Sequence, residues 1–265
     1  MSAGSGLVSV EGGRLYYERA GEGFPVVLIH AGLWDSRMWD DQFEAFSEQH
    51  DVIRYDLRGY GRSDAPTASY SDLRDLRDLL GRLGVTRCAI VGCSMGAQIA
   101  LDFALEHPGV VDGLVPVSPG LSGYAWEDPG LDALLEAVDG AVAEGDLEQA
   151  MAYELAVWTP AGDDPKVDAR IREIAMDNLH IFHVPDVISE GPPAPAFPRL
   201  GQLQAATLVV VGEQDVAEIH AIADAIVERV SGAHKDVIAG ADHLVNMRKP
   251  ERFNRIVLDF LSWRE

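Results

Sequence analysis

Short apolar runs recur along this chain, and helical patterns separate most of them. Runs of this length that are rich in β-branched residues are typical of strands buried on both faces of a parallel sheet. Two earlier runs, Leu7–Val10 and Arg14–Arg19, flank Glu11-Gly12-Gly13 and predict a hairpin. The chain is therefore expected to be an α/β protein with a mostly parallel sheet of about eight strands. The later runs are Val26–Ile29, Val52–Tyr55, Ala89–Val91, Leu114–Val117, Leu208–Val211 and Asp236–Ile238.

Helical patterns occupy the intervals between these runs. After Ser71, a residue type favoured at helix N-caps, apolar residues recur with helical spacing from Leu73 to Leu83. Pro250 can begin the last helix, whose predicted apolar face holds Phe253, Val257, Phe260 and Leu261. Alternation of strands and helices predicts right-handed crossovers that place helices on both faces of the sheet.

The alternation stops between about residue 120 and residue 199. Only helical patterns occur here, in Leu131–Val142, Met151–Trp158 and Val167–Ile174, and the Pro-rich run Gly191–Pro198 closes the segment. We expect residues 1–119 and 200–265 to form one core. Residues 120–199 are expected to be a helical insertion that lies over one end of the sheet.

One serine stands in a turn that suits a nucleophile. The sequence Gly92-Cys93-Ser94-Met95-Gly96 lies between an apolar strand and a helix of small and apolar residues. A serine on so sharp a turn projects its hydroxyl outwards, and the flanking glycines remove side chains that would clash. The start of the following helix supplies N–H groups and the positive end of the helix dipole, which favour a developing oxyanion.

A serine hydroxyl needs a base to become a nucleophile, and the base needs an acid to orient it. Among the eight histidines, His243 is best placed, because it follows a late strand and precedes the final helix. Asp215 also follows a strand and is the predicted acid. Glu213 is a weaker candidate, and Asp242 is too close in sequence to reach the far nitrogen of the His243 ring. The order serine, aspartate, histidine is the one that this arrangement of strands and helices favours.

With these residues the chain resembles the α/β-hydrolase family over nearly its full length. Besides the serine turn, the resemblance rests on Leu28–Gly32, on Asp56–Ser63 and on the stretch from Asp242 to Leu261. It implies an α/β-hydrolase fold in which residues 120–199 are a helical cap. It also implies that the backbone N–H groups of Gly32 and Met95 form an oxyanion hole. The chain departs from the usual family pattern at Ala31, at Ala97 after the serine turn, and at Arg248.

Several apolar residues, most of them tryptophans, are candidates to contact substrate. Leu33, Trp34, Trp126 and Trp158 are the predicted substrate-binding residues, whereas Trp39 has the helical spacing of a core residue. His30 is expected to be a buried structural residue of its turn. His180 and His183 could share one helix face, but no third ligand lies within reach in the sequence, so neither a metal nor a cofactor is expected.

Composition limits the partners of the protein. The net charge of −22 argues against nucleic acid or an anionic membrane as a partner. It favours either simple solubility or a field that steers cationic ligands. Cys88 and Cys93 are predicted on one strand, about 16 Å apart, which is too far for a disulfide. The N-terminal sequence lacks the features of a signal peptide, and no apolar stretch is long enough for a membrane span, so a cytoplasmic protein is expected. The sequence leaves open whether the protein forms a homo-oligomer.

These residues predict a serine hydrolase that cleaves a small or medium neutral carboxylic ester through an acyl-enzyme on Ser94. Lactones, enol-lactones and the carbon–carbon bonds of dienone ring-cleavage products are alternatives, because the same triad serves all of them. A serine at the turn argues against resemblance to epoxide hydrolases and haloalkane dehalogenases, which use a carboxylate there. A protein of the same fold that binds a small molecule without turnover is the alternative from another class.

Overall fold

The computed structural model describes residues 4–160, 162, 164–183 and 189–262. Within these residues the strands form one eight-stranded sheet with the order β1-β2-β4-β3-β5-β6-β7-β8. Strand β2 pairs antiparallel with both β1 and β4, and all other pairs are parallel. The mostly parallel sheet predicted from the sequence is confirmed. The strands are β1 Gly4–Val10, β2 Gly13–Ala20, β3 Pro25–Ile29, β4 Asp51–Tyr55, β5 Cys88–Cys93, β6 Val111–Val117, β7 Ala206–Gly212 and β8 His234–Ile238.

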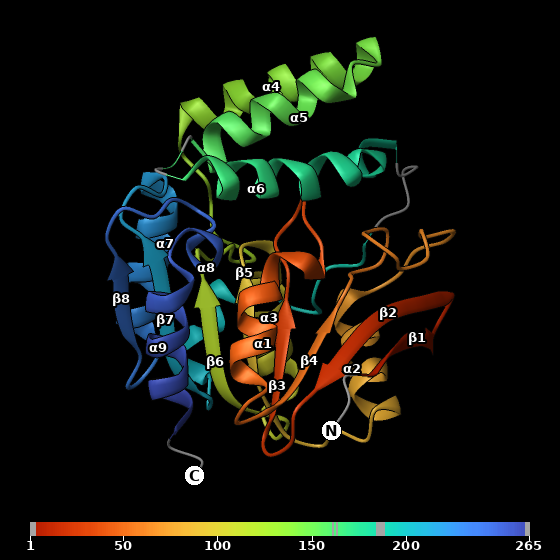
Figure 1. Cartoon of the computed structure of the whole chain (residues 1–265). Helices are drawn as coiled ribbons and strands as arrows, with labels where there is room; N and C mark the ends of the chain where they lie inside the picture. The colour runs from red at the N-terminus through yellow and green to blue at the C-terminus, as the bar shows by residue number, and fades with distance from the viewer. Residues whose placement is uncertain (1–3, 161, 163, 184–188, 263–265) are drawn as a thin grey trace.

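Helices cover both faces of the sheet (Figure 1), because alternate residues of the central strands point to opposite sides. Val27 and Ile90 belong to a buried cluster with α2, α3 and α7. Val26 and Val91 belong to a second cluster on the other face, with α1, α8 and α9. These helices are α1 Asp40–Phe46, α2 Asp72–Arg82, α3 Met95–Glu106, α7 Ala217–Arg229, α8 Val245–Arg248 and α9 Pro250–Leu261.

Three further helices lie above the end of the sheet at which the parallel strands finish, and we call them the α4–α6 layer (Figure 1). They are α4 Pro129–Glu144, α5 Leu147–Trp158 and α6 Pro165–Asp177. Helix α4 packs on α5 through a small separate cluster that includes Leu134, Val138 and Ala150. Each of the three helices has an aspartate N-cap whose side chain accepts a backbone N–H. Short 3₁₀ helices occur at Ser36–Trp39, Leu179–His183 and Phe197–Gln202.

Helix α6 is joined to the sheet-bearing part of the molecule by polar contacts. The Trp34 indole N–H donates to the carbonyl oxygen of Ile171 at 3.0 Å. The Asn178 side-chain amide donates to Asp35 Oδ2 at 2.9 Å. Arg248, at the end of α8, forms ion pairs with Asp242 and with Asp168 of α6. Helix α6 is thereby fixed beside the ends of the strands, and α4 and α5 lie further out.

The structure also bears on the predictions for the two cysteines, for membrane-spanning helices and for Ser71. Cys88 and Cys93 lie on one strand, and both thiols are free and buried. In the part of the chain that is described, no helix is long and apolar enough to cross a membrane. Ser71 is the N-cap of α2, where its side chain accepts from the Arg74 N–H at 3.4 Å.

Candidate active site

Ser94 occupies the turn between β5 and α3. Its backbone has φ 53° and ψ −112°, in the region of positive φ that non-glycine residues rarely adopt. A side chain at Gly92 would overlap the carbonyl group of Gly96, and one at Gly96 would overlap the carbonyl oxygens of Ile29 and His30. The two glycines therefore allow the strand and the helix to approach closely enough to hold this conformation.

Backbone hydrogen bonds fix the turn on several sides. The Ser94 N–H donates to the Val117 carbonyl oxygen at 2.9 Å. The Ser94 carbonyl oxygen accepts from the N–H groups of Ala97, Gln98 and Gly120 at 3.0 to 3.1 Å. Because so many bonds determine the backbone, the strained serine is held in place rather than relaxing.

Asp215 and His243 come from loops that follow neighbouring strands, β7 and β8. The His243 Nδ1 atom lies 3.0 Å from both carboxylate oxygens of Asp215. Both side chains are almost fully buried, with 2% and 1% of their surfaces exposed. Asp215 also accepts from the Val216 N–H at 2.9 Å. The aspartate is thus positioned to keep Nδ1 protonated, which leaves Nε2 of the same ring free to accept a proton.

The charge state of Asp215 suits this role. Burial alone raises the pKa of Asp215, but the charge and hydrogen bond of His243, together with hydrogen bonds from Ser118 and the Val216 N–H, outweigh burial. The net result is a pKa below the ordinary value for an aspartate, so the carboxylate stays ionised at neutral pH.

His30 has a different role. Its Nε2 accepts from the Leu57 N–H at 2.9 Å, so Nδ1 carries the proton and donates to the Ala31 carbonyl oxygen at 2.8 Å. Burial lowers the pKa of His30 and keeps it neutral. Both ring nitrogens are used within the fold, as expected for a structural residue.

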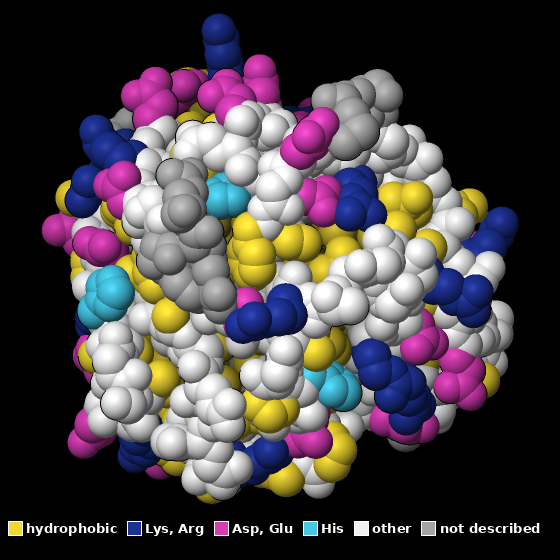
Figure 2. Space-filling view, turned by 90° about the horizontal axis from the view of Figure 1, so that it is seen from below, with side chains coloured by type: hydrophobic (Ala, Val, Ile, Leu, Met, Phe, Trp, Pro, Cys, Tyr) yellow, Lys and Arg dark blue, Asp and Glu magenta, His cyan; other side chains and the backbone are white. Residues whose placement is uncertain are grey.

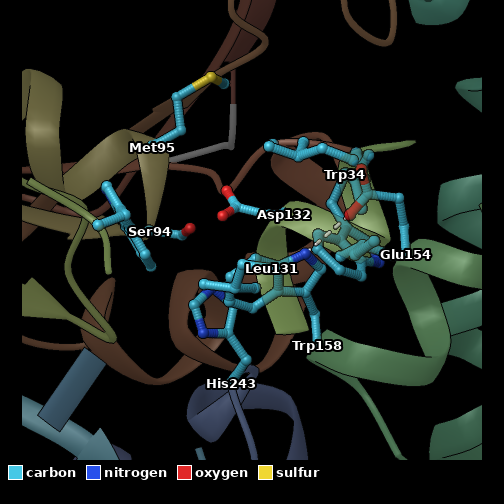
Figure 3. A pocket seen from close by; sticks show the side chains of 13 residues that line it. Trp34, Ser94, Met95, Leu131, Asp132, Glu154, Trp158 and His243 are labelled. Atoms are coloured by element: carbon cyan, nitrogen blue, oxygen red, sulfur yellow. Dashed lines mark hydrogen bonds between the residues drawn. The ribbon is translucent and has the colours of Figure 1, made fainter. Parts of the chain in front are cut away.

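Ser94 and His243 line one cavity of about 390 Å³, which Figure 3 shows from close by. Its wall is mainly apolar and draws on both the sheet-bearing part and helices α4 and α5. Gly32 and Met95, the predicted oxyanion-hole residues, belong to this wall. The lining residues are Gly32, Leu33, Trp34, Ser94, Met95, Trp126, Leu131, Asp132, Leu134, Leu135, Glu154, Trp158 and His243.

The structure brings the predicted substrate-binding residues to this cavity as well. Leu33, Trp34, Trp126 and Trp158 all line it. Trp34 is buried, whereas Trp126 is 42% exposed. The Trp158 ring centroid lies 4.6 Å from that of His243, so a residue of α5 contacts the imidazole directly.

Sequence reasoning missed the contribution of helix α4 and one residue of α5. Leu131, Leu134 and Leu135 were expected only as part of a helical pattern, and they form one wall of the cavity. Asp132 and Glu154 line it too, although acidic residues on such helices usually face solvent. No lysine or arginine is among the described residues that line the cavity. His180 is placed elsewhere, with its Nε2 3.0 Å from the Gly59 carbonyl oxygen. Over the described ranges, no group of three metal-ligating side chains is assembled.

The fold and this arrangement of residues agree with a comparison against known families. The model of the alpha/beta hydrolase family matches residues 26–256. The chain therefore belongs to the alpha/beta hydrolase family, and the resemblance predicted from the sequence is confirmed.

Individual relatives share only limited sequence identity with this chain or match only part of it. An uncharacterized protein of Mycobacterium tuberculosis is 38% identical, but the match covers only 42% of this chain and 34% of that protein. A 2-hydroxy-6-oxo-6-phenylhexa-2,4-dienoate hydrolase of Comamonas testosteroni is 26% identical over 94% of this chain and 92% of its own length. The solved structure of Est816, described as an N-acyl homoserine lactone degrading enzyme, is 28% identical with a TM-score of 0.80, and the match covers 96% of this chain and 100% of that one. The protein is thus similar to several kinds of hydrolase.

Proposed function

We propose that this alpha/beta hydrolase is a serine esterase for small or medium neutral carboxylic esters. The observation that carries the proposal is the geometry around Ser94. A serine held at positive φ shares a cavity with His243, whose other ring nitrogen is paired with a buried aspartate. Nucleophile, base and orienting acid are the parts that acyl transfer requires.

Each residue has a definite task in the proposed reaction. Ser94 Oγ attacks the ester carbonyl while His243 Nε2 takes the hydroxyl proton, and Asp215 stabilises the imidazolium that forms. The backbone N–H groups of Gly32 and Met95 hold the oxyanion of the tetrahedral intermediate. The protonated His243 then gives its proton to the leaving alcohol. Water activated by His243 hydrolyses the acyl-enzyme.

The lining of the cavity favours an uncharged ester over an anionic substrate. The wall is mostly apolar, its only charged side chains are Asp132 and Glu154, and no cation among the described lining residues could pair with a carboxylate. A dienoate substrate, such as the one named for the Comamonas relative, carries a carboxylate that would meet repulsion here. Carbon–carbon bond cleavage is therefore the weaker alternative. A neutral lactone is the stronger second candidate, because Est816 resembles this chain over nearly its full length.

The α4–α6 layer is proposed to be the cap of this enzyme, with residues 120–199 as the insertion and residues 1–119 and 200–265 as the catalytic core. Helices α4 and α5 supply five residues of the cavity wall besides Trp158. Substrate size would then be set by this layer. We also propose that the protein is cytoplasmic and that its partner is a small-molecule ester substrate.

The test is turnover of a substrate panel by the purified protein. p-Nitrophenyl acetate, butyrate and octanoate, an uncharged lactone and a dienone are compared by kcat/KM, with Ser94→Ala as the control. The proposal predicts the highest kcat/KM for one of the esters and a loss of several orders of magnitude in Ser94→Ala. A strong preference for the dienone, or residual ester cleavage unchanged in Ser94→Ala, would contradict it. A ligand bound tightly but never turned over would favour the binding protein instead.

A further inference from the structure

Two carboxylates stand in the otherwise apolar wall of the cavity. Asp132 comes from the first turn of α4, and Glu154 comes from the middle of α5. In the view of Figure 3 the Asp132 carboxylate lies between Ser94 and Trp34, and Glu154 lies further along the same wall. Both negative charges therefore face the space that the substrate would occupy.

The Glu154 carboxylate is fixed in place but not neutralised. The Trp158 indole N–H donates to Glu154 Oε2 at 2.8 Å, which orients the carboxylate. Burial raises the pKa of Glu154, although this hydrogen bond offsets part of the rise. Among the described residues, neither Glu154 nor Asp132 takes part in a salt bridge. Glu154 is half-buried, whereas Asp132 is exposed. A partly buried carboxylate such as Glu154 is costly without a cation, and a positive charge on a bound molecule would remove that cost.

The aromatic residues of the cavity suit the same kind of ligand. Trp34, Trp126 and Trp158 all contribute to its wall. The face of an indole attracts a cation, and ammonium groups are commonly bound between aromatic rings and carboxylates. The net charge of −22 acts in the same direction at long range, because it raises the local concentration of cations.

We propose that this cavity also accepts esters that carry an ammonium group, and that Glu154 and Asp132 favour them over neutral esters of the same shape and over anionic esters. The proposal rests on the proposed esterase function and extends its substrate class from uncharged esters to esters that carry a positive charge. Glu154 and Asp132 are specificity-determining residues here and take no part in the bond-breaking steps. The acyl-enzyme chemistry at Ser94 is unchanged by the charge of the substrate.

A matched pair of esters tests the proposal. Choline butyrate and 3,3-dimethylbutyl butyrate have the same shape and differ in one atom, a positively charged nitrogen against a neutral carbon. The ratio of their kcat/KM values is measured at pH 8 and at low salt, where screening of charges is weak. The wild-type ratio is expected to be at least about 10 in favour of the choline ester, and monobutyl succinate, an anionic ester, is expected to be the slowest.

Variants assign the effect to the two carboxylates. Glu154→Gln and Asp132→Asn are each expected to lower the ratio, and the double variant should bring it close to one. Glu148→Gln is the matched control, because Glu148 lies on the same helix, is exposed and does not line the cavity. It should keep the wild-type ratio and the wild-type activity.

Binding without turnover separates this proposal from the proposed function. Calorimetry with Ser94→Ala compares the affinities of the two unreacted esters. Tighter binding of the choline ester supports the inference even if the wild-type protein cleaves neither ester, in which case the esterase function alone fails. Equal affinities, or a wild-type ratio near one, would overturn the inference while the esterase function stands. A preference that persists in the double variant would also overturn it, because the selectivity would then come from elsewhere.

Discussion

At the scale of single residues, the site depends on positions where ordinary preferences are violated. Ser94 is one of three described residues other than glycine with positive φ, together with Leu33 and Ser118. Leu33 and Ser94 both line the cavity. Backbone strain is retained in folded proteins only where surrounding bonds over-determine it, and it gathers at functional sites. The backbone strain at Ser94 therefore supports its proposed role as the nucleophile.

Gly92 should tolerate no side chain. Its Cβ would overlap the carbonyl group of Gly96 and the backbone nitrogen of Ala97, neither of which can move without opening the turn. Gly92→Ala is expected to lower the free energy of unfolding by about 2 kcal/mol or more and to abolish the proposed esterase activity. Gly140→Ala is the control, because a Cβ there meets nothing within 4 Å and helix α4 should gain about 0.5–1 kcal/mol. Urea denaturation measures both, and equal stabilities for the two variants would be inconsistent with the steric account.

Asp102 should make stability depend on pH. Burial raises its pKa to about 6, although a hydrogen bond from Ser122 and the charge of Arg199 lower it. An aspartate in the unfolded chain has a pKa of about 3.9, so the folded state binds the proton more tightly than the unfolded state does. The protein should therefore lose about 3 kcal/mol of stability from this group as pH rises from about 4 through 6, and nothing more above that range.

Asp102→Asn should remove this pH dependence. The difference in unfolding free energy between the variant and the wild type is expected to move in favour of the variant between pH 4 and 7 and then to level off. Denaturant unfolding at a series of pH values provides the measurement. A difference that stays constant over this range would show that the Asp102 carboxyl is not perturbed in the folded protein.

At the scale of elements, the sequence predicted those strands and turns that local residue patterns encode. Strands β3 to β7 were predicted because each is a short apolar run, and the Ser94 turn was predicted because its glycines are required by backbone contact. The first three residues of β1, from Gly4 to Gly6, were not predicted, because their place comes from backbone pairing with β2 rather than from their own propensity.

The site shows a similar division. Ser94, Asp215 and His243 could be grouped from the sequence because the carboxyl ends of parallel strands meet at one edge of the sheet. Asp132 and Glu154 could not, because their place in the cavity depends on how α4 and α5 lie across that edge. A helical pattern gives the apolar face of each helix and leaves its orientation above the sheet undetermined.

Arg248 should couple helix α6 to the loop that carries His243. Its side chain is 5% exposed and pairs with Asp242, which is 3% exposed, and with Asp168. Arg248→Met leaves a buried Asp242 carboxylate without its cation, so a loss of about 3 kcal/mol is expected. Hydrogen exchange should accelerate in α6. The double variant Asp242→Asn, Arg248→Met should be more stable than Arg248→Met alone, and a double variant that is less stable would refute the coupling.

At the scale of the whole molecule, the excess of acidic side chains is the dominant electrostatic feature. The chain has 43 Asp and Glu residues against 21 Lys and Arg residues. On the face shown in Figure 2, acidic and basic side chains are interspersed, so local pairs offset part of the repulsion. The remaining negative charge repels itself in the compact state.

Added salt should therefore stabilise the folded protein. The thermal midpoint is expected to rise between about 0.01 and 0.15 M NaCl, because the screening length falls from about 30 to 8 Å over that range. Most of the increase should come at these low concentrations, as screening requires. Scanning calorimetry measures the midpoint. A midpoint that falls with salt would mean that the surface ion pairs contribute more than the net repulsion.

Ser94 is proposed to be an activated nucleophile, and labelling with a fluorophosphonate probe is a direct test of that role. The folded protein is treated with the probe, and mass spectrometry locates the modified residue, with Ser94→Ala and His243→Ala alongside. We expect modification of Ser94 in the wild type, none in Ser94→Ala and much slower labelling in His243→Ala. A folded wild-type protein that stays unlabelled, or that labels as fast without His243, would contradict it.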